Sequence, residues 1–320
     1  MGGGTLLVSI PKSWARKNGI TKGATLAVEE LSERKLIVRP IEDLETLTKE
    51  TTVEYPREDL SYVVNDVTGA YLLGYDQIHI QGRRAMTRED RERLKATIGR
   101  LIGLEIMDED SKKMTLQFLL EPAGLNPEKI ARRMASIIGG MMKDTREGIS
   151  ELDPKLLSTV EERDDEVDRL YFLLVRIIRT ATIHPEVAER YKLASVEILD
   201  YRVLASFLES VGDTVAELSK RLARDMPSGK LAAGFVDCFG KLEEMEEIAM
   251  RSFLVRGGDR SKGASLELEV LAREVSQAST RMAREKSPRT SVVEVVGLIE
   301  RASKVFVDIA DLSLPNYPIT

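Results

Sequence analysis

Residues 200–224 read DYRVLASFLESVGDTVAELSKRLAR. Leucine and valine recur here at steps of three and four, at positions 204, 208, 211, 215, 218 and 222, which predicts an amphipathic helix. The same spacing continues along the chain from residue 126, interrupted by breaks that contain proline or glycine. It predicts six helical segments: 127–149, 155–182, 187–224, 229–255, 263–286 and 289–313. Their simplest architecture is two successive three-helix bundles that divide near Pro227.

The chain before residue 126 has a different pattern. Residues 5–10, 25–30 and 35–39 have strand-like composition, and Lys12–Gly19 predicts one or two helical turns that end at Asn-Gly. Residues 51–120 then alternate strand, helix, strand and helix before two closing strands, which predicts a small α/β sandwich. The sequence therefore predicts a multidomain, mainly helical protein. Its four domains are a small β domain over 1–46, an α/β domain over 47–122, and helical bundles over 123–226 and 227–320.

The composition excludes several classes of protein. The chain has 320 residues, of which 53 are acidic and 47 are basic, so its net charge is −6. This excludes a uniformly basic nucleic-acid coat but allows a local basic patch. A single cysteine excludes a disulfide framework and fits a reducing compartment. Arginines 176 and 179 interrupt the longest apolar run, and no secretory leader is recognisable, so we expect a cytoplasmic protein without a membrane span.

Histidine is scarce, with His79 and His184 the two in the chain. Sites that rely on histidine to bind zinc or iron, and a Ser-His-Asp triad, are therefore disfavoured, and any bound metal would need carboxylate ligands. A carboxylate-bridged metalloenzyme is an alternative. Helical bundles of that kind usually add Glu-x-x-His ligands, however, and neither histidine is placed for that role. We expect that the protein is not an enzyme.

Acidic residues on two neighbouring predicted helices form the candidate metal site. Asp164 and Asp168 are four residues apart, as are Glu209 and Asp213, so each pair lies on one face of its helix. The two helices should be antiparallel across Pro185, and the point midway between the pairs falls just past that turn. Both pairs are therefore expected at one level of the bundle, where four carboxylates would suit Fe, Mn, Mg or Ca. The alternative is a solvated acidic face.

The corresponding level of the second predicted bundle carries a different pattern. Glu269 is followed four residues later by Arg273, and Glu300 is followed by Lys304. A glutamate four residues before a basic residue stabilises a helix without any metal. We therefore expect ion pairs in the second bundle, and no metal.

The short N-terminal helix is basic, because it contains Lys12, Arg16 and Lys17, with Lys22 close behind. A solvated helix end would explain such a cluster. In a dimer, by contrast, two copies of the helix would form a basic stripe able to contact DNA phosphates.

The sequence around this helix is similar to a known DNA-binding domain. Residues 5–15 read TLLVSIPKSWA and are followed by Gly-Ile at 19–20 and Gly-Ala at 23–24. This segment resembles the swapped-hairpin domain of the AbrB/SpoVT/MazE type. The resemblance implies that two chains interleave into one dimeric β domain. It also implies that the residues at the DNA are Lys12, Ser13, Arg16 and Lys17.

Residues 126–313 resemble PhoU, a phosphate-uptake regulator built from two three-helix bundles. The pairs Asp164–Asp168 and Glu209–Asp213, the second within Glu-x-x-Gly-Asp-x-Val, match the acid-x-x-x-Asp motif of that family. The resemblance implies that these four residues bind metal, either iron or zinc. The second bundle has Glu300-Arg301-Ala302 but lacks the following aspartate. Together with the α/β region, the chain resembles archaeal PhoU-domain regulators that carry an AbrB-like domain.

The two resemblances imply a phosphate-responsive transcriptional regulator. Such a protein would bind promoter DNA as a homodimer and would report phosphate status through its PhoU region, by contact with a phosphate transporter or a sensor protein. The alternative is an accessory protein that does not bind DNA and restrains a phosphate transporter or its sensor at the membrane surface. Neither protein would insert into the membrane.

Overall fold

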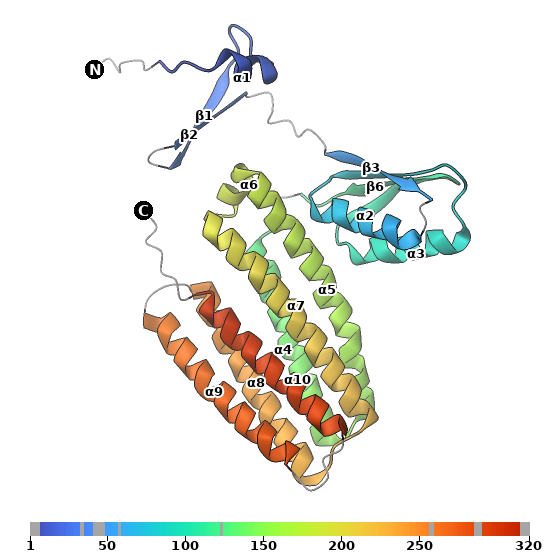
Figure 1. Cartoon of the computed structure of the whole chain (residues 1–320), viewed down its shortest axis with the longest axis vertical. Helices are drawn as coiled ribbons and strands as arrows, with labels where there is room; N and C mark the ends of the chain where they lie inside the picture. Colours follow the sequence, from blue (N-terminus) through green and yellow to red (C-terminus); the bar gives the residue numbers. More distant parts are fainter. Residues whose placement is uncertain are drawn as a thin grey trace. The chain divides into compact units, whose positions relative to one another are not determined.

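The computed structural model forms two compact units, Met1–Lys49 and Glu50–Thr320. It describes residues 7–32, 35–40, 49–56, 59–121, 124–255, 259–284 and 290–313. The fold class is the predicted one, a mainly helical protein with a small β region at the N-terminus and an α/β region before the helices (Figure 1). The predicted boundaries at 46/47 and 122/123 fall outside the described residues, and the boundary at 226/227 stays a prediction.

The first unit contains one short helix and one hairpin: α1 (Lys12–Lys17), β1 (Leu26–Ser32) and β2 (Lys35–Pro40), with β1 antiparallel to β2. The prediction of these three elements is confirmed. The prediction of a strand over residues 5–10 is wrong in its described part, because residues 7–10 have no regular structure. A strand needs a neighbour that accepts and donates its backbone hydrogen bonds, and the sheet of this unit contains β1 and β2 alone among the described residues.

The second unit begins with the predicted α/β region. A four-stranded sheet in the order β3-β4-β6-β5 has β3 parallel to β4 and the other neighbours antiparallel. Two helices cover one face of it (Figure 1), so that inward-facing strand residues such as Ile78 and Ile80 are buried. The elements are β3 (Glu50–Tyr55), α2 (Leu60–Leu72), β4 (Gln77–Gly82), α3 (Arg88–Arg100), β5 (Leu104–Glu109) and β6 (Lys113–Phe118).

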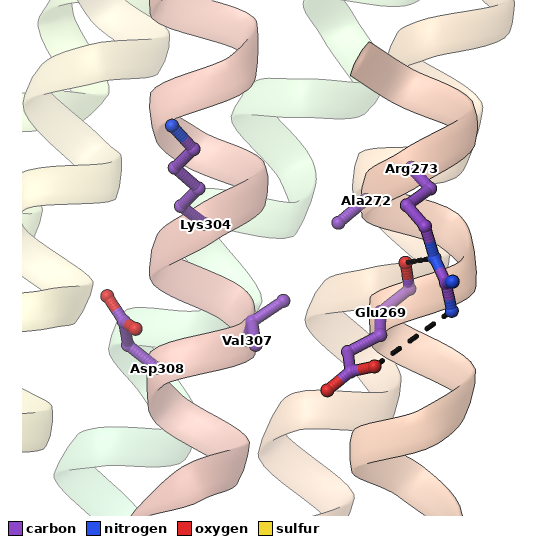
Figure 2. Close-up of a pocket in the computed structure, with 6 residues that line it drawn as sticks. All are labelled: Glu269, Ala272, Arg273, Lys304, Val307 and Asp308. Carbon is purple, nitrogen blue, oxygen red and sulfur yellow. Dashed lines mark hydrogen bonds and ion pairs between the residues drawn. The ribbon is translucent and has the colours of Figure 1, made fainter. Parts of the chain in front are cut away.

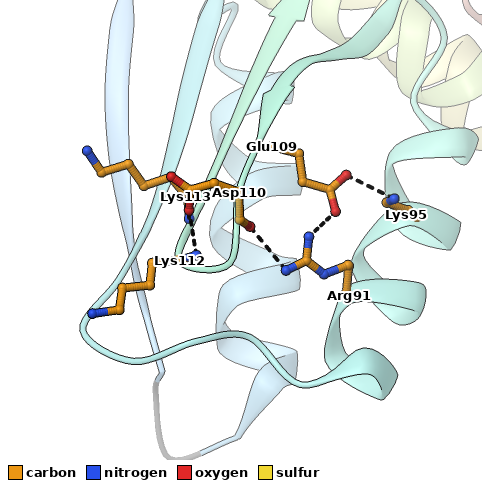
Figure 3. A network of polar contacts seen from close by, with 6 residues as sticks. All are labelled: Arg91, Lys95, Glu109, Asp110, Lys112 and Lys113. Atoms are coloured by element: carbon orange, nitrogen blue, oxygen red, sulfur yellow. Dashed lines mark hydrogen bonds and ion pairs between the residues drawn. The ribbon is translucent and has the colours of Figure 1, made fainter.

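An ionic network ties α3 to the hairpin of β5 and β6 (Figure 3). Glu109 forms ion pairs with Arg91 and with Lys95, whose Nζ lies 2.9 Å from Oε2 of Glu109. Arg91 also donates a hydrogen bond to the backbone oxygen of Asp110 at 3.1 Å. The hydrogen bonds from Lys95 and Arg91 hold the pKa of Glu109 below its ordinary value. The network thus fixes the helix that ends at Arg100.

The helices after residue 126 follow the predicted order with one difference. The third predicted segment, 187–224, is divided into two helices because Lys192 adopts a left-handed conformation with φ of +55°. The Glu197 carboxylate then accepts a hydrogen bond from the backbone N–H of Ala194 at 2.8 Å, which starts the next helix. The observed helices are α4 (Pro127–Glu151), α5 (Pro154–Ile183), α6 (Pro185–Arg190), α7 (Ser195–Arg224), α8 (Gly229–Val255), α9 (Asp259–Ala283) and α10 (Thr290–Asp311).

The six long helices pack in two groups of three. Helices α4, α5 and α7 contact one another, as do α8, α9 and α10, and the groups meet where α4 packs on α8 and α7 packs on α10 (Figure 1). One hydrophobic core runs through both groups without interruption. Among the described residues, no helix combines the length and the apolar composition that a membrane crossing requires.

Arg176 anchors the α/β region to helix α5. Its side chain is buried, and its Nη1 donates hydrogen bonds to the backbone oxygens of Tyr71 at 2.6 Å and Tyr75 at 2.9 Å. The guanidinium carbon lies 3.8 Å from the centre of the Phe118 ring, and Asp76 provides an ion pair at 3.4 Å. The guanidinium group of Arg176 on α5 therefore contacts both the end of α2 and the sheet, and so connects the α/β region to the helical bundle.

Candidate functional site

Helices α5 and α7 pack side by side and bring the predicted acidic residues together (Figure 1). Single carboxylate oxygens of Asp168, Glu209 and Asp213 lie within 4.8 Å of one another. Asp168 and Glu209 are half-buried, whereas Asp213 is exposed, so the cluster opens to solvent. The structure thus gathers three of the four predicted ligands, and their role as ligands stays a prediction.

The fourth residue, Asp164, lies one turn before Asp168, where α5 passes close to Gly212 of α7. A Cβ atom on Gly212 would lie 3.1 Å from Oδ1 of Asp164 and 3.1 Å from a methyl carbon of Val167. Glycine therefore permits the close approach of the two helices at the level of the acids. Oδ1 of Asp164 is buried and accepts no hydrogen bond from any described residue. Such an atom is costly unless water or a cation satisfies it.

Burial and mutual repulsion disfavour the charged forms of these acids. Burial first, and then the nearby charges of Asp213 and Asp168, raise the pKa of Asp164 to about 7. Burial is also the main reason that the pKa of Glu209 is raised, again with Asp213 and Asp168 contributing. The pKa of Asp168 is raised by burial although Arg100 lowers it. The cluster thus gathers acidic groups whose charged forms are disfavoured by partial burial and by one another.

Three arginines that the sequence analysis missed lie around the cluster. Arg100, the last residue of α3, forms an ion pair with Oδ2 of Asp168. Arg202 and Arg301 both lower the pKa of Glu209. Arg202 precedes Glu209 by seven residues, a helical spacing that could have revealed it. Arg100 and Arg301 come from distant elements and leave no such signal.

The donor set fits a divalent cation. Every candidate donor is a carboxylate oxygen, the ligand type that hard cations prefer. Three arginines lie around the four acids, and Arg100 forms an ion pair with Asp168. The buried Oδ1 of Asp164 is left without a hydrogen-bond partner among the described residues. A divalent cation would relieve the repulsion among the acids. Iron or zinc, which the family resemblance implies, stays a prediction.

The second bundle has a groove between α9 and α10 of about 440 Å³. In Figure 2, Ala272 and Val307 face each other across it, while Lys304 and Asp308 point away from α9. Arg273 binds its own helix, with Nη2 at 3.9 Å from the Glu269 carboxylate and Nε donating to the Glu269 backbone oxygen at 3.0 Å. The predicted Glu269–Arg273 ion pair is therefore confirmed. The residues that line the groove are Glu269, Ala272, Arg273, Lys304, Val307 and Asp308.

The other predicted pair of the second bundle, Glu300 with Lys304, is not formed. Glu300 accepts a hydrogen bond from Oγ of Ser276 on α9 at 3.3 Å. That prediction was therefore wrong, because the neighbouring helix supplies a partner that a single-helix argument does not consider.

The predicted DNA-contacting residues are all exposed on α1: Lys12, Ser13, Arg16 and Lys17. The helix ends at Lys17, and the side chain of the next residue, Asn18, donates a hydrogen bond to the backbone oxygen of Trp14 at 2.9 Å. None of the described residues between 7 and 28 is buried. Leu7 is 94% exposed and Val8 is 77% exposed, so this part of the unit does not build its own core.

Replacement of Asp164 by asparagine is expected to stabilise the protein by about 2 kcal/mol at pH 8. The folded state holds the pKa of Asp164 at about 7, above the ordinary 3.8. The folded protein therefore binds the extra proton between these values, and wild-type stability falls as the pH rises through this window. Asparagine cannot ionise, although its amide is still desolvated, which limits the gain. Urea unfolding at pH 8 and at about pH 4 measures the difference.

The gain from Asp164→Asn should shrink toward zero as the pH falls to about 4, because the folded aspartate is then neutral and the cost of its buried charge is gone. Glu162→Gln is the control, since Glu162 is an exposed acid on the same helix, whereas the charge of Asp165 itself raises the pKa of Asp164. An equal gain for both variants, or a gain that does not depend on pH, would contradict the environment described for Asp164.

Comparisons with known proteins identify two domains in the chain. The PhoU domain family matches residues 131–222. The MazE family, described as antidote-toxin recognition MazE, bacterial antitoxin, matches residues 1–45. No curated protein matches the chain. Among solved structures, PhoU from Pseudomonas aeruginosa is similar, with 16% identity and a TM-score of 0.47 over 59% of this chain and 93% of that chain. The chain therefore contains a PhoU domain in its helical region and a MazE-type domain at its N-terminus.

Proposed function

We propose that this protein is a phosphate-responsive transcriptional regulator that binds promoter DNA as a dimer. The observation that carries the proposal is the presence of a MazE-type domain and a PhoU domain in one chain. The two domains support a role in the regulation of phosphate homeostasis. Within that role, the PhoU domain would contact a phosphate transporter or a sensor protein, and the N-terminal unit would contact DNA.

The N-terminal unit supports a dimer through its exposed apolar residues. Leu7, Val8, Val28 and Leu36 are all more than half exposed, and a unit of this size needs a core to be stable. A second copy of the unit would cover these side chains. The same dimer would place two copies of α1 on one molecule, each with three exposed cations at positions 12, 16 and 17. Paired basic segments of this kind suit the regularly spaced phosphates of DNA.

The carboxylate cluster supports a cation site within the PhoU domain. Asp168, Glu209 and Asp213 would hold the cation, with Asp164 as the fourth acid beside them. When bound, the cation would neutralise charge between α5 and α7. The residues themselves join two helices of the first group at one level, so that occupancy of the site would stabilise the packing of α5 on α7.

The DNA part of the proposal predicts salt-sensitive binding to the DNA upstream of the protein's own reading frame. Log K against log salt should be linear, with a slope of about −0.9 for each phosphate contact. Replacing Lys12 and Arg16 together by alanine should weaken binding and should make the slope less steep by about 2 for each protomer. Fluorescence anisotropy of the full chain at several salt concentrations measures both quantities.

Arg132→Ala is the control for this experiment. Arg132 is an exposed arginine on α4 that pairs with Glu128, so its loss removes positive charge without touching the N-terminal unit. Binding that is absent at low salt, or that the two replacements on α1 do not weaken, would contradict DNA recognition. Absent binding would favour the accessory protein that acts on a transporter or sensor.

A further inference from the structure

The α/β region contacts helix α5 through two arginines of different character. Arg176 is buried and donates to two backbone oxygens at the end of α2. Arg100, at the end of α3, pairs with Asp168, which lies eight residues earlier on α5. Eight residues of helix span about 12 Å. The α/β region is therefore held on α5 by a deep contact, that of the buried Arg176, and by a shallow contact, the Arg100–Asp168 ion pair near the surface.

The shallow contact is open to solvent on one side. The Arg100 side chain is 51% exposed, whereas that of Asp168 is 22% exposed. An ion pair of this kind contributes little to stability and is readily exchanged for another partner. Arg176 differs in this respect, because backbone oxygens and the Phe118 ring surround its guanidinium group.

Asp168 belongs to both the shallow contact and the carboxylate cluster. Its Oδ2 pairs with Arg100, and one of its oxygens lies within 4.8 Å of oxygens of Glu209 and Asp213. A guanidinium group and a divalent cation drawn to the same carboxylate repel each other at this range. Because the two equilibria share Asp168, each weakens the other by the same factor.

We propose that Arg100 competes with a divalent cation for Asp168, so that cation binding loosens the end of α3 from α5. This inference rests on the cation site of the proposed function and adds the residue that regulates it. Arg176 keeps the α/β region attached while the Arg100 contact opens. Occupancy of the carboxylate cluster is thereby transmitted to α3, which the Glu109 network ties to the β5–β6 hairpin.

Calorimetric titration of the full-length protein with Mn²⁺ tests the competition. Arg100→Ala and Arg100→Gln should each bind Mn²⁺ about fivefold more tightly than wild type, the factor that corresponds to the upper range for an exposed ion pair. Arg100→Lys keeps the charge and should bind with an affinity close to that of wild type. The control is Arg133→Ala, which removes an ion pair at 2.7 Å to Glu166, two residues before Asp168. Its affinity should not change.

Hydrogen exchange of the last turn of α3, residues 97–100, gives a second readout that does not depend on affinity. Mn²⁺ should accelerate exchange there about fivefold in the wild type, by reciprocity. In Arg100→Ala the exchange should be fast with and without Mn²⁺. Amides around Tyr71, near the buried Arg176 contact, should not respond in either protein.

The outcomes separate this inference from the cation site itself. If Mn²⁺ binds the wild type and Asp213→Asn abolishes binding, but Arg100→Ala binds equally or more weakly, the site stands and the competition is wrong. If the affinity rises but exchange in α3 does not respond to Mn²⁺, the coupling to α3 is wrong. If neither the wild type nor Arg100→Ala binds Mn²⁺, the site and the competition are both wrong.

Discussion

Replacement of Arg176 by alanine is expected to lower the free energy of unfolding by about 4 kcal/mol. The arginine is 4% exposed and donates to the backbone oxygens of Tyr71 and Tyr75. Alanine would leave these two oxygens without their charged donor and would remove the group that packs on the Phe118 ring. The loss should fall mainly on the contact between the α/β region and α5.

Urea unfolding of the full chain followed by circular dichroism measures this effect. Arg169→Ala is the matched control, because Arg169 is an exposed arginine on the same helix, and its loss should cost no more than about 0.5 kcal/mol. Arg176→Lys should recover part of the stability, since lysine keeps the charge but lacks the planar group with several donors. Equal stabilities for Arg176→Ala and Arg169→Ala would show that Arg176 does not anchor the region.

The helices and the order of the α/β elements could be predicted because the signals for them are local. Apolar residues at three- and four-residue steps mark each long helix, and proline or glycine marks most of the breaks. The break between α6 and α7 escaped prediction. It depends on Lys192 in a left-handed conformation. Lysine rarely adopts this conformation, so the sequence does not indicate it.

The strand expected over residues 5–10 failed for a different reason. The composition of a segment indicates that it can form a strand, but a strand is stable only when it pairs with a neighbouring strand. Residues 7–10 have no such neighbour among the residues that the structure describes. A dimer of the proposed kind would provide such a neighbour, because the segment could pair with a strand of the second chain.

For the candidate site, too, one part could be predicted from the sequence and another could not. The matched levels of the acidic pairs could be calculated from helical spacing and one turn, since only the short helix α6 separates α5 from α7 in the sequence. The contact between Arg100 and Asp168 joins residues of two different regions, so no spacing rule could find it. In the sequence, Arg176 is recognisable only as a charge that interrupts an apolar run. The structure shows that this interruption is the buried anchor of the α/β region.

Loss of the cation site is the second large effect that we expect. Replacing Asp168 and Asp213 together by alanine removes two of the three gathered carboxylates, and one remaining acid on each helix cannot hold a divalent cation tightly. In the wild type, Mn²⁺ at a hundred times its dissociation constant should stabilise the folded protein by about 2.7 kcal/mol. The double variant should gain nothing from the same concentration.

The most direct test of the cation site is the metal content of the full-length protein after loading and desalting, measured by elemental analysis. The wild type should retain metal at a fixed ratio to protein, and Glu300→Ala should retain the same amount, since Glu300 is bonded to Ser276 in the second bundle. The Asp168→Ala, Asp213→Ala double variant should retain none. Equal metal content in all three proteins would contradict a cation site between α5 and α7.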